Sequence, residues 1–445
     1  MKKIYLLAVA LAGTLLTSCS DFLDKVPLVV PSSETFLTNQ SAVTNYVNGL
    51  YIALPSAGAY GMGIMGEEKN SDNMVAMVYD RRMNGELQES IGGVTEWQKG
   101  YQNLRSVNYF LEYYKVPAAE ETAEVLSLKG EAYFFRAYWH YYLLTKFGSI
   151  PVMDKFWDGN ATVGGLQIPA RDRSAVAQFI LDDLKAAKEL LYSRSKYQGL
   201  RICKEAAMVM AMRVALFEGT WEKYHKGTDF AAAEYKSDDF LQQVLTLGDE
   251  LFQMGITLNT KENDKSVKNI DDAYGNLFNS KDLSATQEVL FWKKYSIADN
   301  LVHSLNTNLS SGMCDAEGPA GLSQSLVDNY LSVDGNFIDP TAAKFKDFNE
   351  SFKDRDGRLL ATVMHSDCKY KSMTVKGAKK MLVKAYSEED KDLINPPQIV
   401  STGNQSNTTG YHIRMGIDTT FVSGQGETAL SLIHISEPTR HAQIS

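Results

Sequence analysis

The sequence contains little cysteine and none of the motifs that mark common catalytic centres. Of its 445 residues, 4 are cysteines, and they are widely separated without a CxxC pair, which argues against a disulfide framework and a zinc site. HExxH, GxSxG and Walker-loop motifs are absent, and the histidines are scattered without ligand spacing. We therefore predict a protein that is not an enzyme and that carries no metal or other cofactor.

The chain also lacks a surplus of basic residues. Its 45 lysines and arginines are outnumbered by 54 aspartates and glutamates, which gives a formal net charge of −9. Without a basic face to neutralise phosphates, a nucleic-acid partner is not expected. The hydrophobic share of 44% and the charged share of 22% are those of an ordinary globular protein, so we expect one large domain or two closely packed ones.

The N-terminus has the organisation of a bacterial export signal. Lys2 and Lys3 precede an apolar run over Ile4–Leu16, which is too short for an ordinary membrane span. The run ends at Leu16-Thr17-Ser18-Cys19, which resembles the lipobox of lipoproteins. We predict a signal peptide over residues 1–18 and a lipid anchor on Cys19, where each buried acyl methylene contributes about 0.8 kcal/mol to holding the protein at a bilayer.

Apolar residues recur at helical spacing through the first half of the chain. Short joints between successive segments predict antiparallel helix pairs, in a tetratricopeptide-like array without a strict repeat of about 34 residues. The expected fold class is mostly α, with these pairs as a scaffold. The predicted helices cover residues 43–54, 97–111, 122–147, 176–191, 207–221 and 240–254.

Composition divides the chain into a tether, a helical region and a loop-rich region. Residues 19–33 are polar and contain two prolines, so they form the predicted lipid-anchored tether. The helical region covers 34–255 and includes a glycine-rich connection, Pro55–Thr95, of the kind that often carries function. The loop-rich region over 256–429 is expected to pack over the scaffold, with a short helix near Leu322–Leu331.

Aromatic residues crowd the segment from Tyr133 to Tyr142, and they surround the expected helix instead of lining one edge. This distribution favours core packing over an exposed sugar platform. Arg136, in their midst, is expected to pair with a buried carboxylate, either Glu131 or one from a neighbouring helix. Cys203 is expected to pack as a small apolar group.

The end of the chain has a different character. Leu430–Arg440 resembles the translation of a transposase sequencing adapter, so residues 430–445 are treated as a non-native tail. The natural protein is then expected to depart from this sequence near Ala429, and the loop-rich region to be incomplete.

The aromatic run Gly130–Tyr138 is followed by Lys146–Pro151, which contains a Gly-x-x-Pro turn. This combination is the most specific of several stretches in which the chain resembles the SusD/RagB-like family of outer-membrane nutrient-binding lipoproteins. The resemblance extends from Cys19 to about Gly410, although the closing helical segment of the family is absent. The other stretches are Cys19–Pro27, Thr95–Leu104, Arg173–Leu184, Ala206–Trp221, Ser323–Tyr330, Asp334–Gly335 and Arg355–Leu359.

The resemblance implies a lipid-anchored protein of the cell outer membrane that faces the exterior, binds oligosaccharides or other nutrients, and delivers them to a TonB-dependent SusC-like transporter. It also implies that loops from the long connection and from the later half contact the ligand. Rings that stack on sugar C–H faces and polar groups that bind hydroxyls are the expected contacts. The candidate residues are Asp72, Asn73, Tyr79, Arg81, Trp292, Tyr295 and Asn306.

Three other functions remain open at this point. The cargo of the same fold is a peptide in the RagB branch of the family. Carboxylates are plentiful, so a lipid-anchored glycoside hydrolase is not excluded by counting them. A helical-repeat scaffold that binds only other proteins is the third reading.

Overall fold

The structure is a computed structural model that describes fifteen segments of the chain. The predicted signal peptide, Cys19, the tether and the adapter-like tail lie outside them. The described residues are 37–55, 68, 71–76, 84–86, 95–157, 168–260, 270–296, 298–299, 301–303, 313–315, 318–342, 350–365, 369–373, 380–384 and 408–416.

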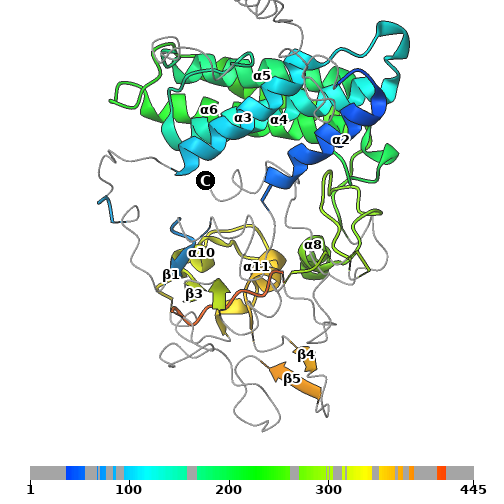
Figure 1. The fold of residues 1–445 in the computed structure, drawn as a ribbon. Coiled ribbons are helices and arrows are strands. Elements are labelled where there is room, and N and C mark those ends of the chain that lie inside the picture. Colours follow the sequence, from blue (N-terminus) through cyan, green and yellow to red (C-terminus); the bar gives the residue numbers. More distant parts are fainter. Residues whose placement is uncertain are drawn as a thin grey trace, which may run out of the picture.

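Helices of the first half form a layered helical scaffold, and Figure 1 shows them packed side by side. Each helix from α3 to α6 packs on the next one in the chain, as α3 on α4, α4 on α5, α5 on α6 and α6 on α7, while α2 packs on α4. This arrangement confirms the mostly α, tetratricopeptide-like fold. The helices are α2 (Gln40–Leu50), α3 (Thr95–Tyr113), α4 (Ala123–Phe147), α5 (Arg173–Leu190), α6 (Lys204–His225) and α7 (Ser237–Gln253).

Side-chain caps fix where several of these helices begin. The Asn39 carboxamide oxygen accepts a hydrogen bond from the backbone N–H of Ala42 at 3.0 Å, and Thr122 caps α4 in the same way. Such caps satisfy backbone donors that have no partner within the helix. Helix α4 ends at Phe147 and is capped by Gly148, whose φ of 70° suits glycine. The described helices contain no segment long and apolar enough to cross a bilayer.

Helix α4 lies at the centre of the scaffold and is buried around most of its circumference. Phe134, Phe135 and Trp139 have 2% or less of their surface exposed, so the aromatic residues form core, as predicted. Glycine allows close approach to α5, because a Cβ at Gly130 would lie 3.0 Å from Leu190 Cβ. Close packing of this kind tolerates little change in side-chain volume.

Three bidentate arginine–carboxylate pairs join helices and loops inside the scaffold. Arg136 of α4 donates to Asp183 of α5 at 2.8 and 2.6 Å, which confirms a partner on a neighbouring helix. The guanidinium of Arg201 binds Glu131 at 2.9 and 2.7 Å, and that of Arg173 binds Glu218 at 2.8 Å in both contacts. The fork geometry of guanidinium satisfies both carboxylate oxygens, which a buried charge requires.

The second half of the chain, joined by strand β1 from the first half, has its own hydrophobic core and small sheets. Strands β1, β3 and β2 form an antiparallel sheet in that order, and β4 pairs with β5. Helices α8 and α11 pack on each other. The elements are β1 (Met74–Ala76), α8 (Ile270–Asn279), β2 (Met313–Asp315), β3 (Gly318–Leu322), α10 (Gln324–Asn329), α11 (Gly357–Thr362), β4 (Lys369–Met373) and β5 (Lys380–Lys384).

Sequence reasoning placed the short helix near Leu322–Leu331 correctly, since α10 lies within it. It missed α8 and the β1–β3 pairing. Strand β1 is only three residues long, and the segment that contains it shows no alternation in the sequence. Strands that pair across such a long separation in the chain need not show any pattern in the sequence around either strand, so the pairing was not predicted.

Arg194, in the short 3₁₀ turn Arg194–Lys196, connects the scaffold to the second half. Its guanidinium donates to four backbone carbonyl oxygens of one loop, at 2.7 Å to Val289 and at 2.9 to 3.1 Å to Thr286, Leu283 and Ser284. Only 8% of its surface is exposed. Because buried carbonyls need donors, this one side chain fixes the loop against the scaffold.

We predict that Arg194→Lys lowers the free energy of unfolding by about 2–4 kcal/mol, because an ammonium group cannot reach all four carbonyls and leaves some of them unpaired. Chemical denaturation of both proteins checks this. Arg171→Lys is the control, since Arg171 forms an exposed ion pair with Asp154 at 3.8 Å. Equal midpoints for the two variants would contradict the role assigned to Arg194.

His140 of α4 generates a second prediction, on pH. The ring is fully buried, its Nε2 accepts from the Met153 N–H at 3.1 Å, and its Nδ1 therefore donates to the Arg136 carbonyl at 2.9 Å. Burial lowers the pKa of His140 to about 3. The unfolded chain binds this proton near pH 6.5, so the free energy of unfolding falls as pH drops from 6.5 to 3, by about 1.4 kcal/mol per pH unit.

We expect His140→Gln to be less stable than the parent at pH 7 by about 1–3 kcal/mol. The difference should shrink by about 2 kcal/mol at pH 5, because the variant lacks the proton uptake on unfolding. Denaturation curves at the two pH values measure it. A difference that stays constant between pH 7 and pH 5 would show that His140 is not the titrating group.

Candidate functional site

A polar turn precedes strand β1, and its hydrogen bonds hold it in one shape. Ser71 Oγ donates to the Glu68 carbonyl at 2.8 Å, and the Asn73 carboxamide donates to the Glu68 carboxylate at 2.8 Å. The backbone N–H of Asn73 donates to Ser71 Oγ at 3.2 Å. The exposed Asp72 lies between these fixed residues, so its carboxylate is presented from a rigid position.

This polar turn is held by a segment more than two hundred residues later. The backbone N–H of Ser323 donates to the Asn73 carbonyl at 2.9 Å, and its hydroxyl donates to the Asp72 carbonyl at 2.5 Å. Strand β1 then pairs with β3, with Met74 opposite Leu322. The polar turn therefore depends on the tertiary fold and not on its local sequence.

Two further polar side chains extend the surface beside the turn. The Tyr411 hydroxyl donates to the Gln324 carboxamide oxygen at 2.8 Å, and Gln324 donates to Asp328 at 2.7 Å. Burial raises the pKa of Tyr411, so its hydroxyl keeps the proton that it donates. The Tyr411 carbonyl accepts from Leu322 N at 2.9 Å, which places these groups next to the β1–β3 pair. An array of acceptors and donors of this kind suits hydroxyl groups of a ligand.

Aromatic rings lie at the beginning of α3. Trp97 is 37% exposed, packs on Tyr101 with ring centroids 4.7 Å apart, and meets the edge of Phe147 at 5.1 Å. Tyr101 is fixed in turn by a hydrogen bond from its hydroxyl to the Pro151 carbonyl at 2.9 Å. One part of the indole therefore remains open to solvent while its neighbours hold it in place, which suits stacking on an apolar ligand face.

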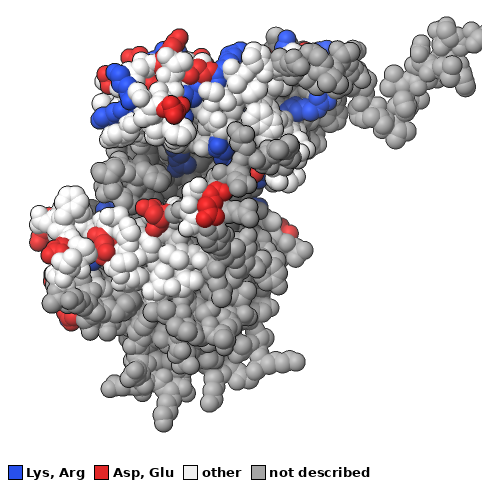
Figure 2. All heavy atoms as spheres, turned by 90° about the vertical axis from the view of Figure 1, so that its left-hand side faces the viewer, with Lys and Arg blue, Asp and Glu red and all other residues white. Residues whose placement is uncertain are grey.

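The aromatic start of α3 and the polar turn lie on the same side of the molecule. In Figure 1, α3 begins on the side of the scaffold that faces the second half, and β1 and α10 lie below it. Figure 2 views this side and shows a recess between the two halves, with basic side chains on the scaffold wall and acidic side chains on the opposite rim. The recess is the candidate functional site.

The predicted site residues have different fates in the structure. Asp72 and Asn73 lie in the polar turn, and Asp72 is exposed. Tyr79, Arg81 and Asn306 lie outside the described residues. The sequence did not indicate Trp97, Gln324 or Tyr411 as ligand contacts. Trp97 becomes a candidate only in the structure, where its side chain is partly exposed at the start of α3.

Trp292 and Tyr295 differ from the expectation, because both are buried. They are 2% and 4% exposed, and the Trp292 indole N–H donates to the Gln198 carbonyl at 2.8 Å. Tyr295 meets His303 edge to face at 4.6 Å. These rings pack in the second core and offer no open face to a sugar, so the expectation that they stack on a ligand is corrected.

Among the described residues, no group of three or more histidine, cysteine, aspartate or glutamate side chains is arranged to hold a metal ion. Cys203 is a buried free thiol whose Sγ lies 3.4 Å from the Leu290 carbonyl oxygen, and burial raises its pKa. It packs as a small apolar residue, as predicted.

Comparison with known proteins gives two family matches along the chain. A family described as "Starch-binding associating with outer membrane" matches residues 21–216, and the SusD family matches residues 281–434. A SusD-like protein of Formosa agariphila is 23% identical over 223 residues, which are 46% of this chain and 41% of that protein. The chain thus matches less than half the length of this relative.

Solved structures share the fold at low sequence identity. A SusD-like carbohydrate-binding protein of Bacteroides fragilis has a TM-score of 0.64 and 17% identity, covering 89% of this chain and 71% of that one. A laminarin-binding SusD-like protein has a TM-score of 0.52 and 16% identity, with 89% and 76% covered. A structure with xylogluco-oligosaccharide has a TM-score of 0.53 and 14% identity, with 91% and 69% covered.

The two family matches cover residues 21–216 and 281–434, and both the relative and the solved structures reported above are SusD-like. The chain belongs to the SusD/RagB family.

Proposed function

We propose that this protein is a non-catalytic receptor for oligosaccharides, anchored by Cys19 to the exterior of the outer membrane, and that it delivers its ligand to a TonB-dependent SusC-like transporter. Membership of the SusD/RagB family supports the proposal, together with similar structures that are named for laminarin or that contain a xyloglucan oligosaccharide. The lipobox at Leu16–Cys19 supports the anchor.

The observations that carry the proposal are the preorganised polar turn before β1 and the partly exposed indole at the start of α3. Asp72 presents acceptor oxygens from a fixed position, and Trp97 presents part of an apolar ring from the side of the scaffold that faces the second half (Figure 1). A sugar ring has both hydroxyl groups and an apolar C–H face, so it is matched by this pairing. The polar groups and the ring are held before ligand arrives, which reduces the entropy lost on binding.

The described residues favour a glycan over a peptide as the cargo. A peptide receptor commonly recruits its ligand by strand addition, which requires an open sheet edge, or through a long apolar groove. The described strands next to the recess are only three to five residues long, and β3 is paired on both sides by β1 and β2. The groups assigned to the candidate site are instead hydrogen-bonded polar side chains and one partly exposed indole.

We predict that Asp72→Ala and Trp97→Ala each weaken oligosaccharide binding about 5- to 30-fold, since each removes one contact of about 1–2 kcal/mol. Calorimetry with laminarin and xyloglucan oligosaccharides measures the dissociation constants. The controls are Asp249→Ala, an exposed carboxylate on α7, and Phe337→Ala, a ring that is 94% exposed. Unchanged affinity in both site variants, with binding intact in the parent, would remove the recess as the site.

Reducing-sugar release on incubation with the bound glycan should be absent, because the proposed role is binding. Release of sugar by the parent protein would establish a glycoside hydrolase instead, with carboxylates of this chain as acid and base.

We expect Cys19→Ala to abolish membrane attachment. Alanine has no thiol to carry acyl chains, and the polar tether at residues 19–33 does not hold the protein at a bilayer without them. Labelling with palmitate and fractionation of the envelope measure this. The parent should carry label and sediment with outer membrane, whereas the variant should carry none and remain in the soluble fraction. A parent protein without label would contradict the anchor.

A further inference from the structure

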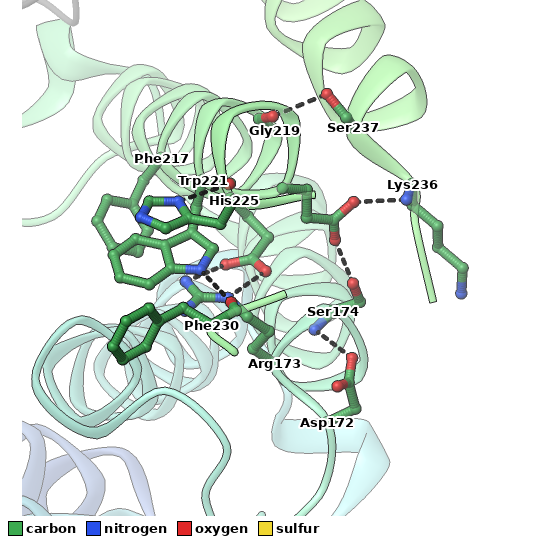
Figure 3. Close-up of polar contacts among 12 residues, drawn as sticks. Asp172, Arg173, Ser174, Phe217, Gly219, Trp221, His225, Phe230, Lys236 and Ser237 are labelled. Atoms are coloured by element: carbon green, nitrogen blue, oxygen red, sulfur yellow. Dashed lines mark hydrogen bonds and ion pairs between the residues drawn. The ribbon is translucent and has the colours of Figure 1, made fainter. Parts of the chain in front are cut away.

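The connection between α6 and α7, over residues 226–236, has no regular secondary structure but is fixed by the ends of two helices. The Asp172 carboxylate, which caps α5, accepts from the Ala233 N–H at 2.8 Å, and Ser174 Oγ donates to the Glu234 carbonyl at 2.9 Å. The Glu222 carboxylate accepts from the Lys236 N–H and also contacts Ser174 Oγ. Figure 3 shows Asp172 and Ser174 at the start of α5 and Lys236 at the end of the connection, in one line of polar contacts.

A stack of charged and aromatic groups supports the outer part of this connection. The Arg173 guanidinium, held by Glu218, lies 3.9 Å from the ring centroid of Trp221. His225 stacks on the same indole at 4.0 Å with an interplanar angle of 14°. Since two groups at these distances cannot share one face, the indole lies between guanidinium and imidazole, as Figure 3 shows. Both faces of the Trp221 indole are therefore occupied, so this ring is not available to a ligand and its role is to hold the connection in place.

The Trp221 indole N–H donates to the Phe230 carbonyl at 3.0 Å, so the stack also fixes the backbone that carries Phe230. The Phe230 ring is 66% exposed and lies 6.3 Å from the His225 ring, edge to face. Tyr235, at the other end of the connection, is 45% exposed, and Tyr224 in the last turn of α6 is 73% exposed. We call Tyr224, Phe230 and Tyr235 the aromatic corner.

The aromatic corner lies at the same end of the scaffold as the aromatic start of α3. Because successive helices are antiparallel, the N-terminus of α3 and the C-termini of α4 and α6 share one end, at the left in Figure 1. Contacts trace the route: Trp97 meets Phe147, and a Cβ on the adjacent Gly148 would lie 3.8 Å from Arg173 Nη1. Arg173 in turn supports Trp221. A continuous series of packed residues therefore runs from Trp97, at the start of α3, to Trp221, which supports the aromatic corner.

We propose that the aromatic corner is a second carbohydrate contact, which binds the extension of a long glycan whose other part occupies the recess. The proposal rests on the proposed function, since both contacts take the same class of ligand. All three exposed side chains are aromatic, which suits stacking on sugar C–H faces. Lysine side chains accompany the rings, with Lys226 Nζ 4.2 Å from the Tyr235 centroid, and they can donate to sugar hydroxyls.

The balanced charge of the connection and its fixed backbone both suit an uncharged polysaccharide as the ligand of the aromatic corner. Within the connection 226–236, Lys226 and Lys236 are balanced by Asp229 and Glu234, so the connection lacks the single-sign charge that attracts nucleic acid or an anionic membrane. Because the hydrogen-bonded connection is ordered before ligand arrives, little conformational freedom is lost when a chain settles on it.

The test separates short ligands from long ones, because a second contact adds avidity only for a chain that spans both. The double variant Phe230→Ala/Tyr235→Ala is compared with the parent by calorimetry with oligosaccharides and by affinity electrophoresis with laminarin and xyloglucan polysaccharides. We expect unchanged oligosaccharide affinity and at least about a threefold weaker retardation by the polysaccharide that binds the parent. The matched control is Leu245→Ala/Phe252→Ala on α7, whose side chains are 63% and 67% exposed.

Retardation of the double variant equal to that of the parent and of the α7 control would overturn the aromatic corner as a glycan contact. The proposed function would stand in that case, because oligosaccharide binding in the recess is measured separately. A parent protein that binds neither oligosaccharide nor polysaccharide would overturn both. Thermal melting of all variants shows whether an altered retardation reflects lost contact or lost fold.

Discussion

The hydrogen bonds between Ser323 and the backbone of Asp72 and Asn73 hold the candidate site together, because they join two segments that are 251 residues apart. Without that junction the polar turn would be a short loop with no fixed position. The β1–β3 pair continues the junction, and Tyr411 joins the same surface through Leu322. A receptor of this kind gains affinity from groups that are already in place.

The scaffold contributes rigidity through guanidinium groups. Arg136, Arg173 and Arg201 each bind a buried carboxylate with two hydrogen bonds, and Arg194 binds four carbonyl oxygens of the second half. Arginine suits all four positions because its planar fork satisfies several acceptors at once, which lysine cannot do. The same chemistry that locks helix to helix also supports the aromatic corner, because Arg173 packs on Trp221.

Local sequence patterns predicted the scaffold well. Helical spacing identified the helices from α2 to α7, and Asn39 and Thr122 cap α2 and α4 close to the predicted helix starts. The crowded aromatics of α4 packed as core, because rings on every side of a helix leave it no solvent face. The family motifs are likewise runs of neighbouring residues, so the sequence alone is enough to recognise them. Of the residues predicted from the sequence to contact ligand, Asp72 and Asn73 lie in the polar turn of the candidate site.

The sequence by itself determined the helical scaffold, the acidic balance and the family motifs, because each can be read from the composition or from residues that are neighbours in the chain. Tertiary structure decided which exposed groups meet. It buried Trp292 and Tyr295 in the second core, left part of Trp97 open, and placed Ser323 beside Asp72. Burial is set by packing between distant segments, so an aromatic residue in a loop-rich region has the same sequence signature whether it lies in a core or on a binding surface.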